Sequence, residues 1–229
     1  QAPGVTFVND PLSIEREIKS DSATHNWNVV LISVESLSGD YMRHFGYQYN
    51  ITPFLDSLIP ESLFFDNFYA SGTRTVRGLE ALSLAIPPTP GQSIVRRPNN
   101  ENLFTMGSVL KDKGYDVNYI YGGNSFFDNM GYFFGHNGYG VLDKSNIPAS
   151  FVNHTTAWGI DDEGTFNYTL GECDKSYKNG KRFFNHIMTV SNHRPYTYPD
   201  GRIDIPSSFK LVAGGVKYTD YAIHKFLTD

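Results

Sequence analysis

The sequence has little cysteine, little charge and no long apolar run. Cys173 is the only cysteine among 229 residues, so no disulfide can form within the chain, and the redox compartment stays undetermined. Charged residues make up 19% of the chain and leave a net charge of -5, which argues against nucleic acid as a partner. No segment approaches the roughly 18 consecutive apolar residues that would span a bilayer. The opening residues, QAPGVTFVND, lack the basic and apolar regions of a signal peptide.

What is present is enough apolar sequence for a substantial core. Hydrophobic residues make up 40% of the chain and aromatic residues 15%, so a chain of this length is expected to fold as one large domain. Residues 1–26 are polar and aperiodic, which indicates a lead-in arm. We therefore expect the domain itself to occupy residues 27–229.

Three runs are typical of buried strands. Residues 28–36 (NVVLISVES) are almost continuously apolar and β-branched, which suits a strand buried on both faces of a parallel sheet. Residues 115–121 (YDVNYIY) alternate, and residues 182–191 (RFFNHIMTVS) are mostly apolar. Residues 124–166, rich in Gly, Phe and Asn, are expected to be mostly loop.

Capping residues mark helices between these strands. Thr52 and Thr105 are expected N-caps, and Gly114 is expected to end the second of these helices. Residues 79–86 and 215–229 predict two further helices. Strands that alternate with helices predict an α/β fold, with a largely parallel sheet and helices on both faces.

Polar clusters follow all three predicted strands. Glu35 and Ser36 end the first strand, residues 122–129 (GGNSFFDN) follow the second, and residues 191–195 (SNHRP) follow the third. A fourth cluster, within residues 67–82 (NFYASGTRTVRGLEAL), places hydroxyls and arginines just before a helix. Because ligand sites in open α/β sheets lie outside the carboxyl ends of the strands, we expect these clusters to form one site.

Glu35 is the first candidate ligand. It directly follows the run VVLISV, where an unpaired buried carboxylate would be costly. One interpretation is a metal ligand, because carboxylate oxygens suit magnesium, manganese, calcium and zinc. The other is a carboxylate that pairs with an arginine or caps a neighbouring helix.

Thr73 and Thr75 are the candidate nucleophiles. A hydroxyl becomes strongly nucleophilic when a base or a metal lowers its pKa. The start of a helix favours an anion such as phosphate or sulfate, and Arg74 and Arg77 add guanidinium charge for the same oxygens. The alternative is an ordinary N-cap threonine flanked by solvated arginines.

His193 is a candidate for substrate binding or acid–base chemistry, because it follows a strand and precedes a proline that stiffens the loop. It is equally explained as a surface histidine. His186 lies inside the predicted strand, and we expect it to be structural.

Several segments, taken in order, resemble one family. They are NVVLISVES, NFYASGTRTVRGLEAL, SVLKDKGYDVNYIYGGNSFFDN, IMTVSNHRPYTYP and YTDYAI. Together they resemble the extracytoplasmic domain of the lipoteichoic acid synthase-like phosphoglycerol transferases, in the sulfatase branch of the alkaline phosphatase superfamily. The resemblance implies an alkaline phosphatase/sulfatase-like core.

The resemblance also implies a chemistry. A threonine takes a phosphoglycerol group covalently from a phospholipid headgroup and passes it to a glycan or glycerol-phosphate acceptor. Thr75 matches that nucleophile, with Thr73 as the alternative, and Glu35 and Thr75 match ligands of one divalent metal. Manganese is the first choice, with zinc, magnesium or calcium as alternatives. His193 matches the substrate-binding histidine, and Arg74 is expected to assist it.

Two places depart from the family pattern. The lipoteichoic enzymes carry a Trp and an Arg after the GN turn, where this chain has Phe127 and Asn129. We expect these two residues to take part in substrate binding, with Arg74 and Arg77 supplying the missing charge. The family's Asp-His metal pair lies on a strand after the YTDYAI helix, which this sequence does not reach, so the core is expected to be incomplete at its C-terminal end.

Further expectations follow from the same resemblance. The chain alone should be inactive or nearly so, and its parent should be a membrane-anchored enzyme whose domain faces the periplasm. Two alternatives stay open. A sulfatase-type hydrolase needs a C/S-x-P-x-R pattern, but Ser71 is followed by Gly72 and Thr73. A non-catalytic glycan or lipid-headgroup binding domain would use the aromatic residues 126–139.

Overall fold

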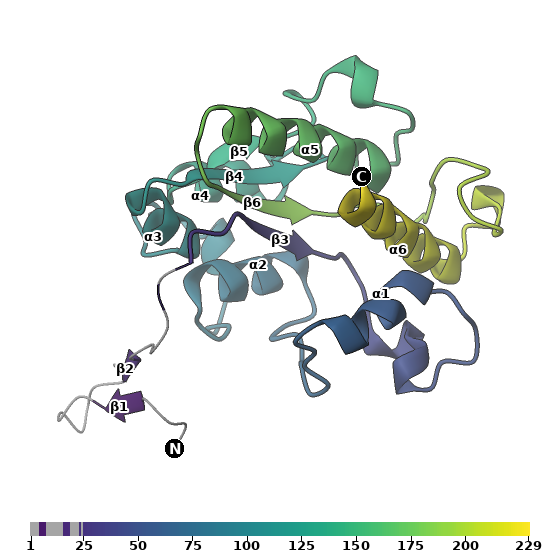
Figure 1. Ribbon diagram of the computed structural model, residues 1–229, viewed down its shortest axis with the longest axis horizontal. Helices are drawn as coiled ribbons and strands as arrows, with labels where there is room; N and C mark the ends of the chain where they lie inside the picture. Colours follow the sequence, from purple (N-terminus) through teal and green to yellow (C-terminus); the bar gives the residue numbers. More distant parts are fainter. Residues whose placement is uncertain (1–4, 8–15, 19–22, 24) are drawn as a thin grey trace.

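The computed structural model describes residues 5–7, 16–18, 23 and 25–229, and a parallel sheet lies at its centre (Figure 1). Within these residues the sheet has the strand order β3-β6-β4-β5. All of its strand pairs are parallel. The strands are β3 (Val29–Ser33), β4 (Asp116–Tyr121), β5 (Gly140–Leu142) and β6 (Phe183–Met188).

Helices cover both faces of this sheet (Figure 1). On one face, side chains from β4 and β6 pack against α2, α3 and α4. On the other face, Ile120 and Ile187 pack against α5, α6 and α1. The helices are α1 (Pro53–Leu58), α2 (Thr75–Leu84), α3 (Met106–Asp112), α4 (Met130–Gly135), α5 (Asp162–Lys178) and α6 (Val212–Thr228).

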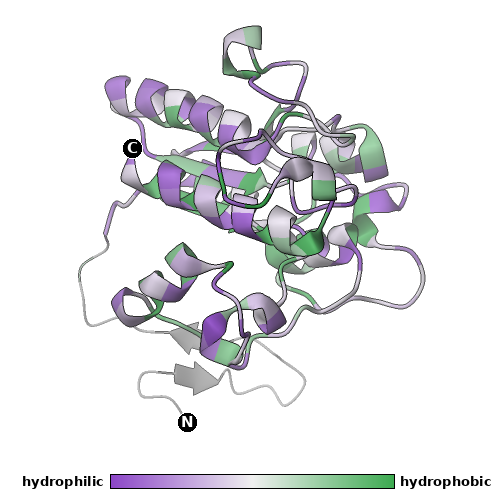
Figure 2. Cartoon of the chain, turned by 90° about the vertical axis from the view of Figure 1, so that its right-hand side faces the viewer, coloured by the Kyte–Doolittle hydropathy of each residue, from purple (hydrophilic) through white to green (hydrophobic). Residues whose placement is uncertain are grey.

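The period-two alternation of the strands produces these two cores. Tyr119 and Tyr121 of β4 face one layer of helices, while Ile120 between them faces the other. Figure 2 shows apolar residues in green gathered at the centre of the domain, with many polar residues in purple on the outer helices. The predicted α/β architecture, with a parallel sheet and helices on both faces, is therefore confirmed.

The three predicted strands are present, but the first is less buried than its sequence suggests. β3 lies at one edge of the sheet among the described residues, and Val30 remains 37% exposed. The expectation that this strand is buried on both faces is therefore wrong. His186 of β6 is fully buried, as a structural histidine should be, and its Nε2 lies 2.7 Å from Oγ of Ser33. Burial lowers the pKa of His186 to about 3, so its ring is neutral.

The predicted helix boundaries are most accurate for the helix with a capping residue at its start and a glycine at its end. Thr105 accepts a hydrogen bond from the backbone N–H of Ser108 in a capping box, and Gly114 follows this helix at a φ of +82°. Thr52 precedes α1 as expected, but its hydroxyl donates to Asp56 Oδ2 and makes no capping hydrogen bond to a backbone N–H of this helix. The helix predicted at residues 79–86 begins earlier, at Thr75.

Residues 124–166 contain more regular structure than expected. They hold α4, β5 and the start of α5. The 17-residue helix α5 has no counterpart among the predicted elements, because it buries polar residues along with apolar ones and so lacks a clean apolar stripe. In the expected arm, residues 1–26, β1 (Val5–Phe7) pairs with β2 (Arg16–Ile18), and most of its other residues lie outside the described part.

None of the helices in the described part of the chain is both long enough and apolar enough to cross a bilayer.

Candidate active site

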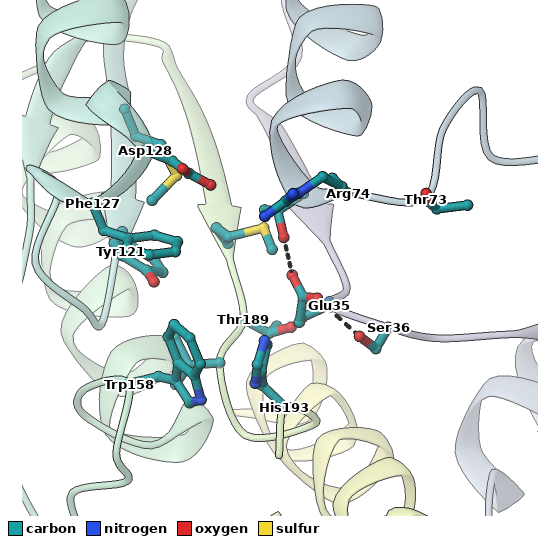
Figure 3. A pocket seen from close by; sticks show the side chains of 14 residues that line it. Glu35, Ser36, Thr73, Arg74, Tyr121, Phe127, Asp128, Trp158, Thr189 and His193 are labelled. Carbon is teal, nitrogen blue, oxygen red and sulfur yellow. Dashed lines mark hydrogen bonds between the residues drawn. The ribbon is translucent and has the colours of Figure 1, made fainter. Parts of the chain in front are cut away.

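A cavity of about 290 Å³ opens at the carboxyl edge of the sheet (Figure 3). Its walls come from the segments that follow β3, β4 and β6, and from the start of α2. The polar clusters that the sequence placed at three strand ends therefore meet at one place, as open parallel sheets require. The lining residues used below are Glu35, Arg74, Thr75, Tyr121, Phe127, Asp128, Trp158, Thr189 and His193.

Thr75 and Glu35, which both line the cavity, contact each other. Thr75 is the first residue of α2, and its hydroxyl donates a 2.8 Å hydrogen bond to Oε2 of Glu35. Oε1 of Glu35 accepts from the hydroxyl of Ser36 at 2.8 Å. Thr73 also lines the cavity, but Figure 3 shows it lying apart from Glu35. The hydroxyl that meets the carboxylate is therefore that of Thr75.

The backbone of Glu35 is held by the segment that follows β6. Its N–H donates to Oγ1 of Thr189 at 2.8 Å, and its carbonyl oxygen accepts from the Asn192 amide at 2.9 Å. These bonds join the ends of β3 and β6, which pair in parallel along all of β3. Glu35 is thus fixed by the same loop that carries His193.

Aromatic rings form one wall of the cavity. The ring of Trp158 lies 3.9 Å from that of His193 and meets Phe127 edge-on at 5.5 Å between centroids. Trp158 Nε1 donates to the carbonyl oxygen of Arg194 at 2.7 Å. The wall therefore has fixed orientation and an apolar surface beside the polar groups of Glu35 and Thr75.

Trp158 reaches this wall through a close backbone approach. Gly159 has a φ of +149°, and a Cβ there would collide with the carbonyl oxygen of Gly122 after β4. The neighbouring Ile160 N–H donates to that same oxygen at 2.9 Å. Only glycine can occupy position 159. Its close packing against Gly122 places the preceding residue, Trp158, at the end of β4.

Tyr121 supplies a permanent hydroxyl donor. Burial, with the carboxylates of Glu35 and Asp128 nearby, raises the pKa of Tyr121 to about 12. The phenol therefore stays protonated at neutral pH. Asp128 lies opposite Arg74 across the cavity (Figure 3) and pairs with Arg96 at 3.4 Å.

The two predicted arginines have different surroundings. Arg74 precedes α2, lines the cavity and is exposed, and Figure 3 shows its guanidinium on the cavity side of the helix start. Arg77 instead pairs with the buried Glu80 at 2.8 Å and donates to the carbonyl oxygens of Thr89 and Gly91. Arg77 lies outside the cavity because the buried carboxylate holds its side chain there.

Of the two residues predicted after the GN turn, one lines the cavity. Phe127 does, whereas the Asn129 amide is turned away and donates to the carbonyl oxygen of Val95 at 2.9 Å. Asp128 and Trp158 line the cavity, and we did not predict them. Asp128 stands between Phe127 and Asn129, the two residues that were predicted. Trp158 lies in a region that was expected to be loop. The only local feature that could have indicated its role is the Trp-Gly pair just before the acidic start of a helix.

The residues present fit a divalent cation only in part. The Glu35 carboxylate and the Thr75 hydroxyl are adjacent oxygen ligands of the kind that hard cations prefer. In the part of the chain that the structure describes, no group of three or more His, Cys, Asp or Glu side chains could hold a metal ion. The pair is therefore compatible with two ligands of a larger set.

Comparisons with known proteins identify relatives of this chain. Lipoteichoic acid synthase 2 of Bacillus subtilis (strain 168) is 24% identical over 213 residues, which cover 88% of this chain and 32% of that protein. Phosphoglycerol transferase I of Xanthomonas campestris is 25% identical over 182 residues, which cover 73% of this chain and 25% of that protein. The chain thus spans a third or less of the length of these relatives.

A solved structure shows the same fold. A protein in the alkaline phosphatase superfamily from Vibrio parahaemolyticus superposes with a TM-score of 0.84 and 35% sequence identity, over 90% of this chain and 50% of that one. The Sulfatase family matches residues 27–229, which is nearly the whole chain. This protein therefore belongs to the Sulfatase family, with a core of the alkaline phosphatase type.

Proposed function

We propose that this chain carries the nucleophile of a metal-dependent transferase or phosphodiesterase, which moves a phosphoglycerol-type group from a phospholipid headgroup through a covalent phosphothreonine at Thr75. The observation that carries the proposal is the 2.8 Å hydrogen bond from the Thr75 hydroxyl to Oε2 of Glu35, at the start of a helix and inside a cavity. The names of the two relatives, a lipoteichoic acid synthase and a phosphoglycerol transferase, support the same substrate class.

Thr75 attacks the phosphorus atom in the first step. A bond forms from Oγ1 to phosphorus, the bond from phosphorus to the diacylglycerol oxygen breaks, and that oxygen takes a proton from water. The Thr75 proton leaves along its hydrogen bond to Oε2 of Glu35 and passes on to water, so the Glu35 carboxylate keeps its charge. In the second step an acceptor hydroxyl attacks phosphorus and releases its proton to water, while Thr75 Oγ1 leaves and takes a proton from water.

A divalent metal would be held by Glu35 and Thr75 among its ligands, and it would supply positive charge that lowers the pKa of the hydroxyl. Manganese is our first choice for this ion. Positive groups of the chain itself would stabilise the negative charge on the phosphoryl oxygens of the substrate. Arg74 lies beside the start of α2, whose first backbone N–H groups point out of the helix toward an anion.

His193 and the aromatic wall would hold the headgroup. Nδ1 of His193 lies 3.1 Å from the carbonyl oxygen of Arg194, which can only accept, so the proton belongs on Nδ1. Nε2 is then an acceptor for a hydroxyl of the glycerol group. Phe127 and Trp158 would pack against the carbon atoms of that group and exclude water.

Sulfatase-type hydrolysis has less support at this site. Cys173 lies on α5, where its Sγ accepts from the Asn185 amide at 3.2 Å. Ser71 is not among the residues that line the cavity. These observations favour a threonine over Cys173 or Ser71 as the proposed nucleophile. We also propose that the domain acts outside the cytoplasmic membrane, within reach of the lipid donor.

The test is cleavage of phosphatidylglycerol with a fluorescent acyl chain by the full-length gene product, measured as diacylglycerol release with manganese added. Thr75→Val, which keeps the shape and removes the hydroxyl, should lower turnover by about 10³-fold or more. Thr73→Val is the matched control and should stay within about threefold of the wild type. Turnover that survives in Thr75→Val would exclude this threonine as nucleophile. Comparing the 229-residue chain with the full-length product of its gene tests the expected low activity of the chain alone.

A further inference from the structure

A buried carboxylate, that of Asp162, holds the segment that follows β6. Asp162 is the first residue of α5 and is 1% exposed. Its Oδ1 accepts hydrogen bonds from the backbone N–H groups of Val190 at 2.7 Å and Ser191 at 3.1 Å. Its own N–H donates to Oγ of Ser191 at 3.0 Å. Asp162 and Ser191 therefore bind each other at two points, and the segment cannot shift there without breaking these bonds.

A second helix contributes to the same carboxylate. Oδ2 of Asp162 accepts a 2.8 Å hydrogen bond from the hydroxyl of Thr219 on α6. The helices α5 and α6 pack against each other (Figure 1). The carboxylate thus joins three parts of the fold, which are the start of α5, the middle of α6 and the segment after β6.

The residues next to the anchored pair hold the catalytic groups. Oγ1 of Thr189 accepts from the N–H of Glu35, and the Asn192 amide donates to the carbonyl oxygen of Glu35. His193 follows directly, and its ring packs against that of Trp158. Figure 3 shows Thr189 and His193 beside Glu35. The two anchored residues thus lie between Thr189 and Asn192, the two residues that fix Glu35.

Burying the charge of Asp162 carries a cost in free energy. In the described part of the chain, the hydrogen bonds to this carboxylate come from neutral donors, two backbone N–H groups and one hydroxyl. Burial raises the pKa of Asp162, although these three donors oppose the rise. A buried carboxylate without a cation stabilises a fold poorly compared with apolar packing. What it provides is fixed geometry, because one oxygen accepts from two successive N–H groups.

We propose that Asp162 is a positioning residue, which anchors residues 189–193 and thereby fixes Glu35 against Thr75 and the ring of His193 at the cavity wall. Asp162 is not among the residues that line the catalytic cavity, so it acts through this segment. The effect on turnover rests on the proposed function. The effect on the position of Glu35 does not, because it requires neither lipid nor metal.

Two variants at position 162 separate geometry from charge. Asp162→Ala removes the acceptor of the Val190 and Ser191 N–H groups. Asp162→Asn keeps this acceptor, because its side-chain carbonyl oxygen can accept from both, while its amide can donate to the Thr219 hydroxyl. The asparagine variant should therefore rescue what the alanine variant loses.

Asp220 supplies the matched control. It is 2% exposed and also accepts from two successive backbone N–H groups, those of Phe54 at 3.1 Å and Leu55 at 2.8 Å. None of these three residues lines the catalytic cavity. Asp220→Ala should therefore lose stability for the same reason as Asp162→Ala, without moving the catalytic groups.

The first measurement is amide hydrogen exchange, resolved to single residues, in the full-length gene product without lipid or metal. In Asp162→Ala the N–H of Glu35 should exchange about tenfold faster or more than in the wild type, because its acceptor Thr189 is no longer held. Asp162→Asn and Asp220→Ala should leave this exchange within about threefold of the wild type. Unchanged exchange at Glu35 in Asp162→Ala would overturn the proposal.

The second measurement is turnover of phosphatidylglycerol by the same protein with manganese, at a temperature where each variant is folded. Asp162→Ala should lower kcat by about 10²-fold, as expected when reacting groups are misplaced by about 1 Å. Asp162→Asn should stay within about fivefold of the wild type and Asp220→Ala within about threefold. If Asp162→Ala does not fold, Thr219→Val takes its place in both measurements. It removes only the donor to Oδ2 and should lower kcat about tenfold.

The outcomes distinguish this proposal from the proposed function. Equal losses of kcat in Asp162→Ala and Asp220→Ala would show that Asp162 only stabilises the fold, and would overturn the positioning role. Turnover by the wild type, with unchanged kcat in Asp162→Ala or in its replacement Thr219→Val, would overturn it as well. Faster exchange at Glu35 in Asp162→Ala, with no turnover even by the wild type, would overturn the proposed reaction and support the anchoring of Glu35.

Discussion

The hydroxyl of Thr75 lies 2.8 Å from Oε2 of Glu35, although 40 positions separate the two residues in the chain. One residue begins a helix and the other follows a strand, and the sheet brings both to its carboxyl edge. The pair places a hydroxyl beside a proton acceptor at a helix start, which is the arrangement that a covalent phosphotransfer needs.

Glu35→Gln should weaken manganese binding by about tenfold or more, because the amide keeps the size of the side chain but loses the negative charge that hard cations prefer. The measurement is the titration of free manganese by electron paramagnetic resonance. Glu61→Gln, which changes an exposed carboxylate in the short 3-10 helix Ile59–Glu61, is the control. Equal manganese affinity in wild type and Glu35→Gln would remove Glu35 from the ligand set.

Arg74 and Arg77 should respond differently to replacement by methionine. Arg77→Met leaves the Glu80 carboxylate buried without its cation, and we expect the free energy of unfolding to fall by about 3 kcal/mol. Arg74→Met changes an exposed side chain, so stability should stay within about 0.5 kcal/mol while phosphatidylglycerol turnover falls about tenfold or more. Urea unfolding and the lipid assay measure the two effects. A loss of stability in Arg74→Met with unchanged turnover would reverse these roles.

Glu80 should make the folded protein sensitive to acid. Burial acts to raise the pKa of this carboxyl, but the Arg77 guanidinium, the Ser93 hydroxyl and the Ile94 N–H together hold it below its ordinary value of 4.5. Because the folded pKa is depressed, the stability that Glu80 contributes is present above pH 4.5 and is lost as the pH falls through the folded pKa.

The variant Glu80→Gln isolates this contribution. At neutral pH it should be about 2–3 kcal/mol less stable than the wild type, because Arg77 loses its buried partner. The gap should narrow as the pH falls below 4.5 and through the depressed pKa of Glu80 in the folded protein, since the wild type loses its advantage there. Urea unfolding at several pH values gives the comparison. A gap that stays constant over that range would show that the charged form of Glu80 adds nothing.

Trp158 should act on substrate binding more than on the chemical step. Its ring contacts His193 and Phe127 but reaches neither Thr75 nor Glu35 by hydrogen bond. Trp158→Ala should therefore raise the KM for the lipid donor about tenfold with a smaller change in kcat. Trp27→Ala, at the chain's other tryptophan and 70% exposed, is the control. A fall in kcat at unchanged KM would place Trp158 in the chemical step.

The sequence was most informative where local patterns carry physical meaning. The apolar strands, the Thr105 capping box and the polar residues at strand ends follow from local chemistry, and so the fold and the meeting of Glu35, Thr75 and His193 at one edge could be predicted. Helix α5 could not, because its buried polar residues are satisfied by distant partners. Asp162, for example, accepts from the backbone N–H groups of Val190 and Ser191.

Side-chain direction was the other limit. Arg77 and Asn129 belong to the right segments but point elsewhere, because Glu80 and the carbonyl oxygen of Val95 hold them. Trp158 enters the cavity from a loop whose position depends on the contact of Gly159 with Gly122. Such contacts join segments far apart in sequence, so no local pattern reports them.

The most direct test of the account is intact and peptide mass spectrometry after the full-length gene product has been incubated with manganese and phosphatidylglycerol. The account predicts a glycerophosphate adduct on the peptide that contains Thr75, absent in Thr75→Val and present in Thr73→Val. An adduct on Thr73, or donor cleavage with no adduct on either threonine, would contradict it.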